Sequence, residues 1–315
     1  MRKLDVAVIG TGFWGRNHAR NLKELQETRL IAVCDKDGAR AKSIAELFGV
    51  EAYTDSRRML KQEDIDAVTV CTWSTNLAAE AMNVLKAGKH VLVEKPMANS
   101  VQEAKKIVEL AKKKQRYVMV GFLMRFIPGI QRIKEAIEKG EIGTLVYATA
   151  RRVSEWPERI GDVGVVKDLA IHDIDVTRYL FGDDPVEVYA KAGSLRHKQF
   201  EDHAQILLTF KGGKTAFIEA NWLTPYKIRK LTVTGSDAIM SLDYITQEIT
   251  IETSGQTMAP RFEVKEPLKL ELQHFAHSIL NDKEPLITGV DGLKAVQVAE
   301  ATLRSAQKGT AIRLQ

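Results

Sequence analysis

A glycine-rich turn directly after the first apolar segment constrains the fold of this chain most. Val6-Ala7-Val8-Ile9 is followed by Gly10-Thr11-Gly12-Phe13-Trp14-Gly15, and an amphipathic helical stretch continues from there. A buried strand, a G-x-G-x-x-G turn and a helix are together typical of the first βαβ unit of a dinucleotide-binding domain. The alternative is a glycine turn that binds no ligand.

Each glycine of this turn would have its own physical role. Gly10 would permit the tight strand-to-helix turn, Gly12 would let a pyrophosphate approach the backbone, and Gly15 would let the helix pack closely on the strand. The unpaired N–H groups at the start of the helix would then face the phosphates. We expect Phe13 and Trp14, inside the same turn, to contact the cofactor.

An acidic residue supports the choice of NAD as cofactor. Asp35 ends the second apolar strand, 20 residues after Gly15. Its carboxylate would accept hydrogen bonds from the adenine ribose and would repel a 2′-phosphate, so NAD is favoured over NADP. Lys36 and Arg40 lie nearby and would soften this discrimination.

The first 121 residues alternate short apolar strands with amphipathic helices. The predicted strands are 5–9, 29–34, 52–53, 67–71, 90–93 and 117–120, and the predicted helices are 15–25, 39–48, 77–86 and 101–113. Strands that are apolar throughout are buried on both faces, which indicates an α/β domain with a doubly wound parallel sheet, the Rossmann architecture. We therefore assign residues 1–121 to an NAD-binding Rossmann domain.

The pattern changes after residue 121. The predicted strands are 145–153, 186–192, 203–210, 215–221, 229–234, 240–243 and 248–252, and the predicted helices are 129–139, 167–180, 269–280 and 291–307. Gly212-Gly213 indicates a hairpin between two of these strands. We assign residues 122–315 to an α+β domain with a mainly antiparallel sheet, which would bind substrate and form a homodimer or homotetramer. Trp222 suits such an interface.

A lysine stands where open α/β sheets hold their ligands. Glu94-Lys95-Pro96 follows the apolar run Val91-Leu92-Val93. A charged residue at the carboxyl end of a buried parallel strand points into the ligand crevice. The alternative is a surface lysine in a loop. With the glycine-rich turn, Lys95 indicates a redox enzyme rather than a passive nucleotide-binding module.

The third group of candidates lies on the predicted helix 167–180. Asp168 and His172 are four residues apart and share a helix face, so the carboxylate can orient the imidazole and raise its basicity. A general base for an alcohol proton needs this arrangement. Asp173 and Asp175 fall on other faces, and we interpret them as structural. The alternative for His172 is a packed histidine without a chemical role.

Composition excludes several other classes of protein. The net charge is +5 and the pI is about 9.0, but the charges are not blocked, so we expect no nucleic-acid partner. Cys34 and Cys71 lie in apolar runs, and no Cys/His group has the spacing of a metal site. No apolar run is long enough to span a bilayer and no signal peptide is evident, so we expect a cytoplasmic protein without a membrane partner.

Four segments carry a resemblance to a known family. They are Val8-Ile9-Gly10-Thr11-Gly12, Ala87-Gly88-Lys89-His90-Val91-Leu92-Val93-Glu94-Lys95-Pro96, Val120-Gly121-Phe122 with Arg125-Phe126, and Asp168-Leu169-Ala170-Ile171-His172-Asp173-Ile174-Asp175. With them the whole chain resembles the glucose–fructose oxidoreductase / inositol dehydrogenase / rhizopine-catabolism (Gfo/Idh/MocA) family.

The resemblance implies roles for several of these residues. Lys95, Asp168 and His172 would surround the reacting carbinol, and Glu94 and Lys95 would contact the cofactor. The family usually has Thr-Pro after the third strand and then a histidine, whereas this chain has Thr72-Trp73 and Leu77. That loop lies near the nicotinamide-side ribose in the family, so Thr72 and Trp73 are expected cofactor contacts despite the departure.

The substrate is less constrained by the sequence. Arg125, Arg151 and Arg152, with His172, are candidate substrate-binding residues, because bidentate arginines suit phosphate or carboxylate groups. Arg159, Lys227 and Arg229 lie on or beside the same segments. The alternative is that these cations lie on a solvated sheet edge.

The expected activity follows from the cofactor and these candidates. Members of similar length with a Trp-Pro loop, here Trp156-Pro157, resemble the nucleotide-sugar 3-dehydrogenases. We therefore expect an NAD-dependent dehydrogenase of a secondary sugar hydroxyl, with C3 of UDP-N-acetylglucosamine as the specific candidate. Inositol or a free aldose is the alternative substrate, and a non-catalytic NAD-binding sensor is the alternative class.

Overall fold

A computed structural model describes residues 2–158 and 161–314. It divides into two compact units. Unit 1 comprises Met1–Leu123 and Glu266–Val296, and unit 2 comprises Met124–Lys265 and Gln297–Gln315. The candidate cofactor residues all lie in unit 1, whereas Asp168, His172 and the candidate substrate-binding arginines belong to unit 2.

Unit 1 is built on a parallel sheet whose strands are short and largely buried. Within the described residues its strand order is β3-β2-β1-β4-β5-β6. The strands are β1 (Leu4–Ile9), β2 (Thr28–Cys34), β3 (Glu51–Tyr53), β4 (Ala67–Val70), β5 (His90–Val93) and β6 (Val118–Val120). The strand order reverses between β1 and β4, and open parallel sheets bind ligands at the carboxyl ends of the strands beside such a reversal. The predicted doubly wound fold is confirmed.

Helices alternate with these strands and end where their sequences change. They are α1 (Phe13–Glu24), α2 (Gly38–Phe48), α3 (Ser56–Gln62), α4 (Ser74–Lys86) and α5 (Val101–Lys114). Asp37, Asp55 and Ser100 cap α2, α3 and α5 through their side chains, whereas among the described residues no side chain caps α1 or α4. The two uncapped helices follow β1 and β4, the strands on either side of the reversal.

Unit 1 also contains α8 (Pro267–Leu280) and the first part of α9 (Gly289–Lys308). Arg20 and Asn21 of α1 both donate hydrogen bonds to Glu266, at 2.5 and 2.9 Å. On α8, Gln273 donates to Glu27. The division at residue 121 assigned all of 122–315 to the second domain, but these contacts place 266–296 with the first unit.

Unit 2 contains the mainly antiparallel sheet that the sequence predicted. Its order is β14-β13-β12-β11-β7-β10-β9-β8-β15 among the described residues. The strands are β7 (Leu145–Val153), β8 (Glu187–Gly193), β9 (His203–Thr209), β10 (Thr215–Asn221), β11 (Ile228–Gly235), β12 (Ala238–Asp243), β13 (Ile249–Thr253), β14 (Thr257–Met258) and β15 (Ile312–Arg313). Only the β7–β10 pairing is parallel among those described. Gly212 and Gly213, with φ of 74° and 81°, form the turn of the predicted β9–β10 hairpin.

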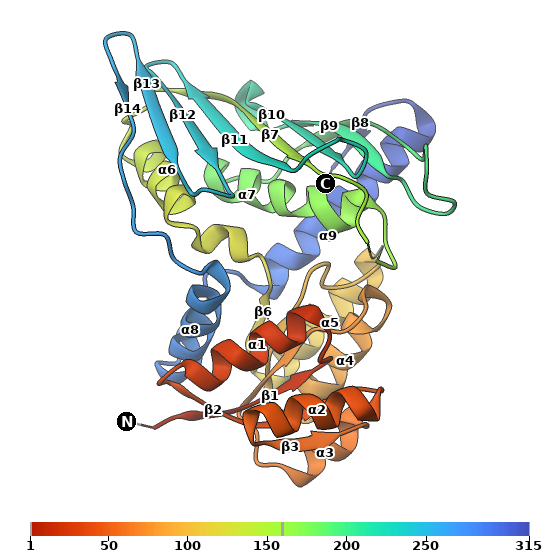
Figure 1. The fold of residues 1–315 in the computed structure, drawn as a ribbon. Helices are drawn as coiled ribbons and strands as arrows, with labels where there is room; N and C mark the ends of the chain where they lie inside the picture. Colours follow the sequence, from red (N-terminus) through yellow and green to blue (C-terminus); the bar gives the residue numbers. More distant parts are fainter. Residues whose placement is uncertain (1, 159–160, 315) are drawn as a thin grey trace. The chain divides into compact units, whose positions relative to one another are not determined.

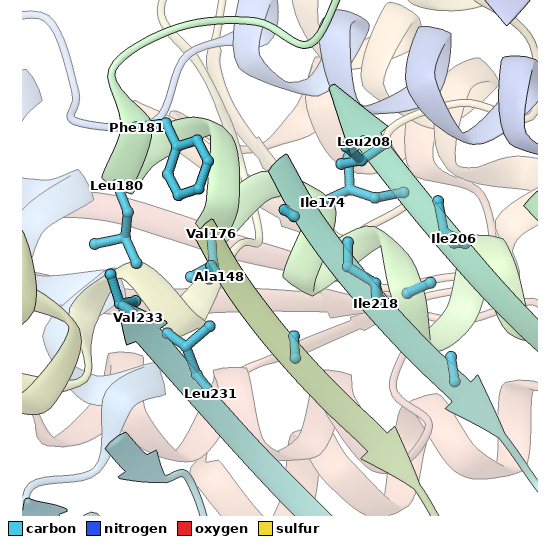
Figure 2. Close-up of a cluster of buried hydrophobic side chains, with 14 of the residues drawn as sticks. Ala148, Ile174, Val176, Leu180, Phe181, Ile206, Leu208, Ile218, Leu231 and Val233 are labelled. Atoms are coloured by element: carbon cyan, nitrogen blue, oxygen red, sulfur yellow. The ribbon is translucent and has the colours of Figure 1, made fainter. Parts of the chain in front are cut away.

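Helices cover one face of this sheet, as Figure 1 shows for α6 (Pro128–Glu138) and α7 (Ile171–Phe181). Side chains of β7, β9, β10 and β11 pack against α7, and Figure 2 shows Ile218, Leu231 and Val233 facing Ile174 and Leu180. Alternate residues point to the other face, where aromatic and aliphatic side chains are exposed. They are Tyr147, Tyr189, Leu207 and Phe217, and we call this surface the open face.

Several short elements were not predicted from the sequence. A 3₁₀ turn at Leu123–Phe126 precedes α6, and α3, β14 and β15 were missed. β14 and β15 have only two residues each, and β15 pairs with β8, far away in the sequence. The predicted helix 167–180 begins as a π-helical segment, Val166–Ala170, before α7. Trp222, expected at an interface, is buried in the unit 2 core instead.

Candidate functional site

The turn between β1 and α1 has the geometry that the glycine pattern predicts. Gly10 has φ 88°, and a Cβ there would lie 2.7 Å from the carbonyl of Cys71. A Cβ on Gly15 would lie 1.7 Å from the carbonyl oxygen of Gly10. A Cβ on Gly12, the N-cap of α1, would meet no described atom within 4 Å. The turn therefore has no space for a side chain at Gly10 or Gly15, whereas the space beside Gly12 is empty of described atoms.

The residues at this turn fit a dinucleotide. In the part of the chain that the structure describes, no side chain caps the N-terminus of α1, and its first turn has no acidic residue, so its N–H groups are suited to a pyrophosphate. Gly12 leaves room for that group to approach the backbone. The anion-binding and steric requirements of the motif are both met within unit 1.

Asp35 lies beside this turn at the end of β2. Its Oδ2 accepts hydrogen bonds from Thr11 N and Thr11 Oγ1, at 2.8 and 3.0 Å, and its Oδ1 accepts one from Asp37 N at 3.0 Å. Burial alone would raise the pKa of Asp35, but the hydrogen bonds from Asp37 and Thr11 outweigh it and lower the pKa. The carboxylate therefore stays ionised at neutral pH.

Arg40 is engaged by two carboxylates. Its Nη1 lies 3.3 Å from Asp35 Oδ2, and its Nη2 lies 3.0 Å from Asp37 Oδ2. An arginine held in this way is less available to a 2′-phosphate than the sequence alone suggested. The local charge around Asp35 thus favours a cofactor without that phosphate.

Three aromatic side chains are exposed at the helix starts that follow β1 and β4. Phe13 is 73% exposed, and Trp14 and Trp73 are each 44% exposed. The Phe13 and Trp14 rings meet edge to face, with centroids 5.7 Å apart. Trp73 is the N-cap of α4, and Thr72 precedes it. Because β1 and β4 are neighbours in the parallel sheet, all these predicted cofactor contacts lie at its carboxyl edge.

Glu94 and Lys95 follow β5, the next strand of the same edge. His18 Nε2 of α1 lies 3.0 Å from Glu94 Oε1, and Lys95 N donates to Glu94 Oε2 at 3.2 Å. His18 is completely buried, and Glu94 is nearly so. The Glu94 carboxylate, which we predicted to contact the cofactor, is therefore held by the protein and links α1 to the backbone of Lys95.

Sequence reasoning missed His18. The signal was present, because His18 stands four residues before Leu22 on the buried face of an amphipathic helix. A histidine on such a face needs a polar partner. The sequence did not identify that partner, since Glu94 is 76 residues away.

In unit 2, Asp168 and His172 fall in different kinds of helix. Asp168 lies in the π-helical segment and is partly exposed, whereas His172 lies in the first turn of α7 and is 7% exposed. We predicted that Asp168 and His172 share a face from the geometry of a regular α-helix. Asp168 lies in a π-helical turn instead, so that geometry does not apply to it. The two residues still occupy adjoining turns at the start of one helical stretch.

Two of the candidate substrate-binding arginines form buried ion pairs. Arg152 binds Asp173 through two hydrogen bonds of 2.6 and 2.8 Å, and Arg125 binds Asp175 through two of 2.8 and 2.6 Å. Burial alone would lower the pKa of Arg152, but Asp173 outweighs it and raises the pKa. Both guanidinium groups thus hold α7, and Asp173 and Asp175 have the structural contacts we expected of them.

The remaining candidate cations are divided between the two faces of the sheet. Arg151 lies on the open face and pairs with Glu219 at 2.9 Å. Arg229 lies opposite Arg152 in the β7–β11 register, on the helix-covered side. Arg159 is outside the described residues. Among these cations, Arg229 therefore lies on the same face of the sheet as the Arg152–Asp173 pair, whereas Arg151 lies on the opposite face.

Within residues 2–158 and 161–314, no group of three or more His, Cys, Asp or Glu side chains could hold a metal ion. Across the same residues, no helix combines the length and apolar character needed to cross a bilayer.

Comparison with known proteins identifies the family. Residues 4–122 match the model of the oxidoreductase family with an NAD-binding Rossmann fold, and residues 130–241 match the Gfo/Idh/MocA C-terminal domain. This chain belongs to the Gfo/Idh/MocA oxidoreductase family. It is an NAD-binding oxidoreductase, as the glycine-rich turn and Asp35 predicted.

Relatives and solved structures match nearly the whole chain. It is 31% identical to the inositol 2-dehydrogenase/D-chiro-inositol 3-dehydrogenase of Halalkalibacterium halodurans, covering 97% of this chain and 92% of that protein. It is 30% identical to the scyllo-inositol 2-dehydrogenase (NAD(+)) of Bacillus subtilis, covering 98% and 95%. The solved UDP-N-acetylglucosamine 3-dehydrogenase of Acidithiobacillus ferrooxidans is 25% identical with a TM-score of 0.90, covering 98% and 99%.

We predict that Asp35→Ala weakens NAD binding about tenfold or more, because a hydrogen bond to a charged group contributes about 1.5–3 kcal/mol. The preference for NAD over NADP should narrow in the same variant. Calorimetric titration of both cofactors measures this, with Asp37→Ala as the matched control that keeps NAD affinity. Binding of NADP about tenfold tighter than NAD by the wild type would contradict the assignment.

We predict that His18→Ala destabilises unit 1 by about 1–3 kcal/mol, because Glu94 loses a buried hydrogen-bond donor. His18→Gln should recover much of this loss, since its amide nitrogen can reach the position of Nε2. Urea unfolding curves of the three proteins measure the difference. Equal stability of His18→Ala and the wild type would show that the contact with Glu94 contributes nothing.

Proposed function

We propose that this protein oxidises a secondary hydroxyl group of a sugar or cyclitol, with NAD as the hydride acceptor. The observation that carries the proposal is the retention of Lys95, Asp168 and His172 at the positions that match the family's motifs. Lys95 follows β5 at the carboxyl edge of the NAD-binding sheet. His172 lies in the first turn of the buried helix α7 of unit 2. A sensor that only binds NAD would not need all three residues.

Each of the three residues has a distinct proposed role. Bound NAD supplies the hydride-accepting nicotinamide. His172 takes the hydroxyl proton as the general base, and Asp168 orients its imidazole. Lys95 donates a hydrogen bond to the substrate oxygen and stabilises the negative charge that develops on it.

The specific substrate we favour is UDP-N-acetylglucosamine, oxidised at C3. The solved 3-dehydrogenase of Acidithiobacillus ferrooxidans supports this choice through its 25% identity over nearly the whole chain. Inositol is the second candidate, because relatives of about 30% identity are named inositol dehydrogenases. NADH formation at 340 nm with UDP-N-acetylglucosamine, myo-inositol, scyllo-inositol and free aldoses tests the proposal. NAD binding without reduction by any of them would favour the sensor.

We predict that Lys95→Ala and His172→Ala each lower turnover by about 10²- to 10⁴-fold, the range for general acid–base groups. NAD affinity should change little, because both residues act chiefly on the substrate oxygen, and Lys95 is only one of many predicted cofactor contacts. Asp168→Asn should have a comparable or smaller effect, since it keeps a side chain beside His172 without the charge. Stopped-flow measurement of NADH formation gives the rates. A variant with nearly wild-type turnover would remove that residue from the mechanism.

We also propose that the open face of unit 2 forms a homodimer or homotetramer. Leu207 and Phe217 are directly opposite across β9 and β10, and Tyr189 is opposite Leu207 across β8 and β9. Exposed apolar side chains in one row of a sheet are suited to burial against a second sheet. Arg151 and Glu219 form an ion pair in the adjoining row.

We predict a particle of at least twice the chain mass of 35.2 kDa by light scattering at micromolar concentration. Phe217→Asp should shift it toward the monomer, because a buried unpaired carboxylate is costly. Leu195→Asp is a suitable control, since Leu195 is 80% exposed in a loop outside the sheet. A wild-type mass near that of one chain would contradict the proposed assembly.

A further inference from the structure

We propose that Arg229 and Lys227 form a binding site for a carboxylate or phosphate group of the substrate. The inference rests on the proposed function, because it assigns an anionic class to the sugar that this enzyme oxidises. It also goes beyond the expected role of Arg151 and Arg152, whose guanidinium groups are paired with Glu219 and Asp173.

The placement of Arg229 follows from strand register. Its Cα is directly opposite that of Arg152 in the antiparallel pair β7–β11, so the two side chains point to the same face of the sheet. This face carries α7, because Arg152 reaches Asp173 of that helix. Lys227 lies two residues before Arg229, just ahead of β11. The positive charges of Arg229 and Arg152 both act on Lys227.

Two carboxylates act on these three cations, Asp173 and Asp168, so positive charge remains in excess. Asp173 holds Arg152 through both oxygens and also accepts a 3.4 Å hydrogen bond from Tyr244. Among the described residues, no carboxylate lies within 4.0 Å of the charged nitrogens of Arg229 or Lys227. The acceptor that Arg229 does have is the carbonyl oxygen of Val153, 3.4 Å from Nη1.

Arg229 is costly to hold in this position without an anion. Its guanidinium carries five N–H donors, and one long hydrogen bond satisfies few of them. Burial, reinforced by the charge of Arg152, lowers the pKa of Arg229 to about 10, despite the attraction of Asp173 and Asp168. Lys227 is exposed, and partial desolvation lowers its pKa, with the charges of Arg229 and Arg152 adding to the effect. An anionic group would relieve this repulsion and could accept both donors of the arginine fork.

The cationic pair also lies beside the candidate catalytic residues of unit 2. Asp173, bound to Arg152, directly follows His172 in α7. The negative charge of Asp168 acts on Arg229 and on Arg152. An anion bound by Arg229 and Lys227 would therefore fix the substrate close to the start of α7, where the proposed base is. This gives the site a means of selecting anionic over neutral sugars.

Binding to the NAD-saturated enzyme tests the site without relying on turnover. Calorimetric titrations use UDP, glucuronate, inorganic phosphate and myo-inositol, and saturating NAD prevents UDP from entering the dinucleotide site. We expect at least one anion to bind and Arg229→Gln to weaken it by about 10- to 100-fold, as for a lost hydrogen bond between charged groups. Lys227→Gln should weaken it less, and Arg261→Gln, an exposed arginine of unit 2, should not change it. Binding by UDP and phosphate would indicate a phosphate, and binding by glucuronate alone a carboxylate.

Three results would overturn the inference. They are the absence of binding by all three anions, equal anion affinity in Arg229→Gln and the wild type, and a large loss of thermal stability in unliganded Arg229→Gln. The last result would mark Arg229 as a structural residue. The charge repulsion instead predicts that unliganded Arg229→Gln has a thermal unfolding midpoint no lower than that of the wild type.

The outcomes also separate this inference from the proposed function. If neutral polyols are oxidised with the same KM by Arg229→Gln and the wild type, and no anion binds, the dehydrogenase function stands and the anion site is wrong. If Arg229→Gln loses anion binding but no tested hydroxyl is oxidised by the wild type, the anion site stands and the proposed function fails.

Discussion

The contact between Gly15 and the carbonyl oxygen of Gly10 is the constraint on which the rest of unit 1 depends. It leaves no space for a side chain, so α1 begins directly against β1 with its N-terminus at the carboxyl edge of the sheet. Thr11 of the same turn binds Asp35, and His18, one turn after Gly15, reaches Glu94. The helix that would receive the pyrophosphate is therefore linked both to Asp35, the acid predicted to bind the ribose, and to the segment that carries the candidate catalytic lysine.

In unit 2, buried ion pairs hold the helix that carries a candidate catalytic residue. Asp173 and Asp175 of α7 bind Arg152 of β7 and Arg125 of the preceding 3₁₀ turn. Removing two charges from water is costly, and bidentate geometry offsets much of that cost while fixing direction. These pairs fix the helix that carries His172. They also pair two arginines that the sequence alone suggested as substrate-binding residues. Arg229, which is partly buried, has no carboxylate close to it among the described residues.

Most of the fold was predictable because its signals are local. Apolar runs and intervening amphipathic stretches located the strands of the parallel sheet, and Gly212-Gly213 located a hairpin. The structure groups segment 266–296 with unit 1 through contacts with α1, more than 200 residues away, which no local sequence pattern predicts. β15 was missed for the same reason, since its two residues pair with a strand over 100 residues earlier.

The residues of the candidate site that belong to local sequence motifs could be predicted. The glycines and Asp35 could be placed at the start of α1 and the end of β2 because the spacing of the motif fixes their positions. Which cations are paired depends on strand faces and tertiary partners, so the sequence could not separate Arg152 from Arg229. The partner of His18 and the π-helical turn at Asp168 likewise needed three-dimensional information, because neither has a distinct local pattern.

Isotope transfer measures most directly whether a carbon-bound hydrogen passes from the substrate to NAD. UDP-N-acetylglucosamine deuterated at C3, and myo-inositol deuterated at every carbon, would be incubated separately with the enzyme and NAD, and the recovered cofactor examined by mass spectrometry. If the enzyme is a dehydrogenase of this kind, one of these substrates yields reduced cofactor carrying a single deuterium. Unreduced NAD with both compounds, or reduced cofactor without the label, would contradict it.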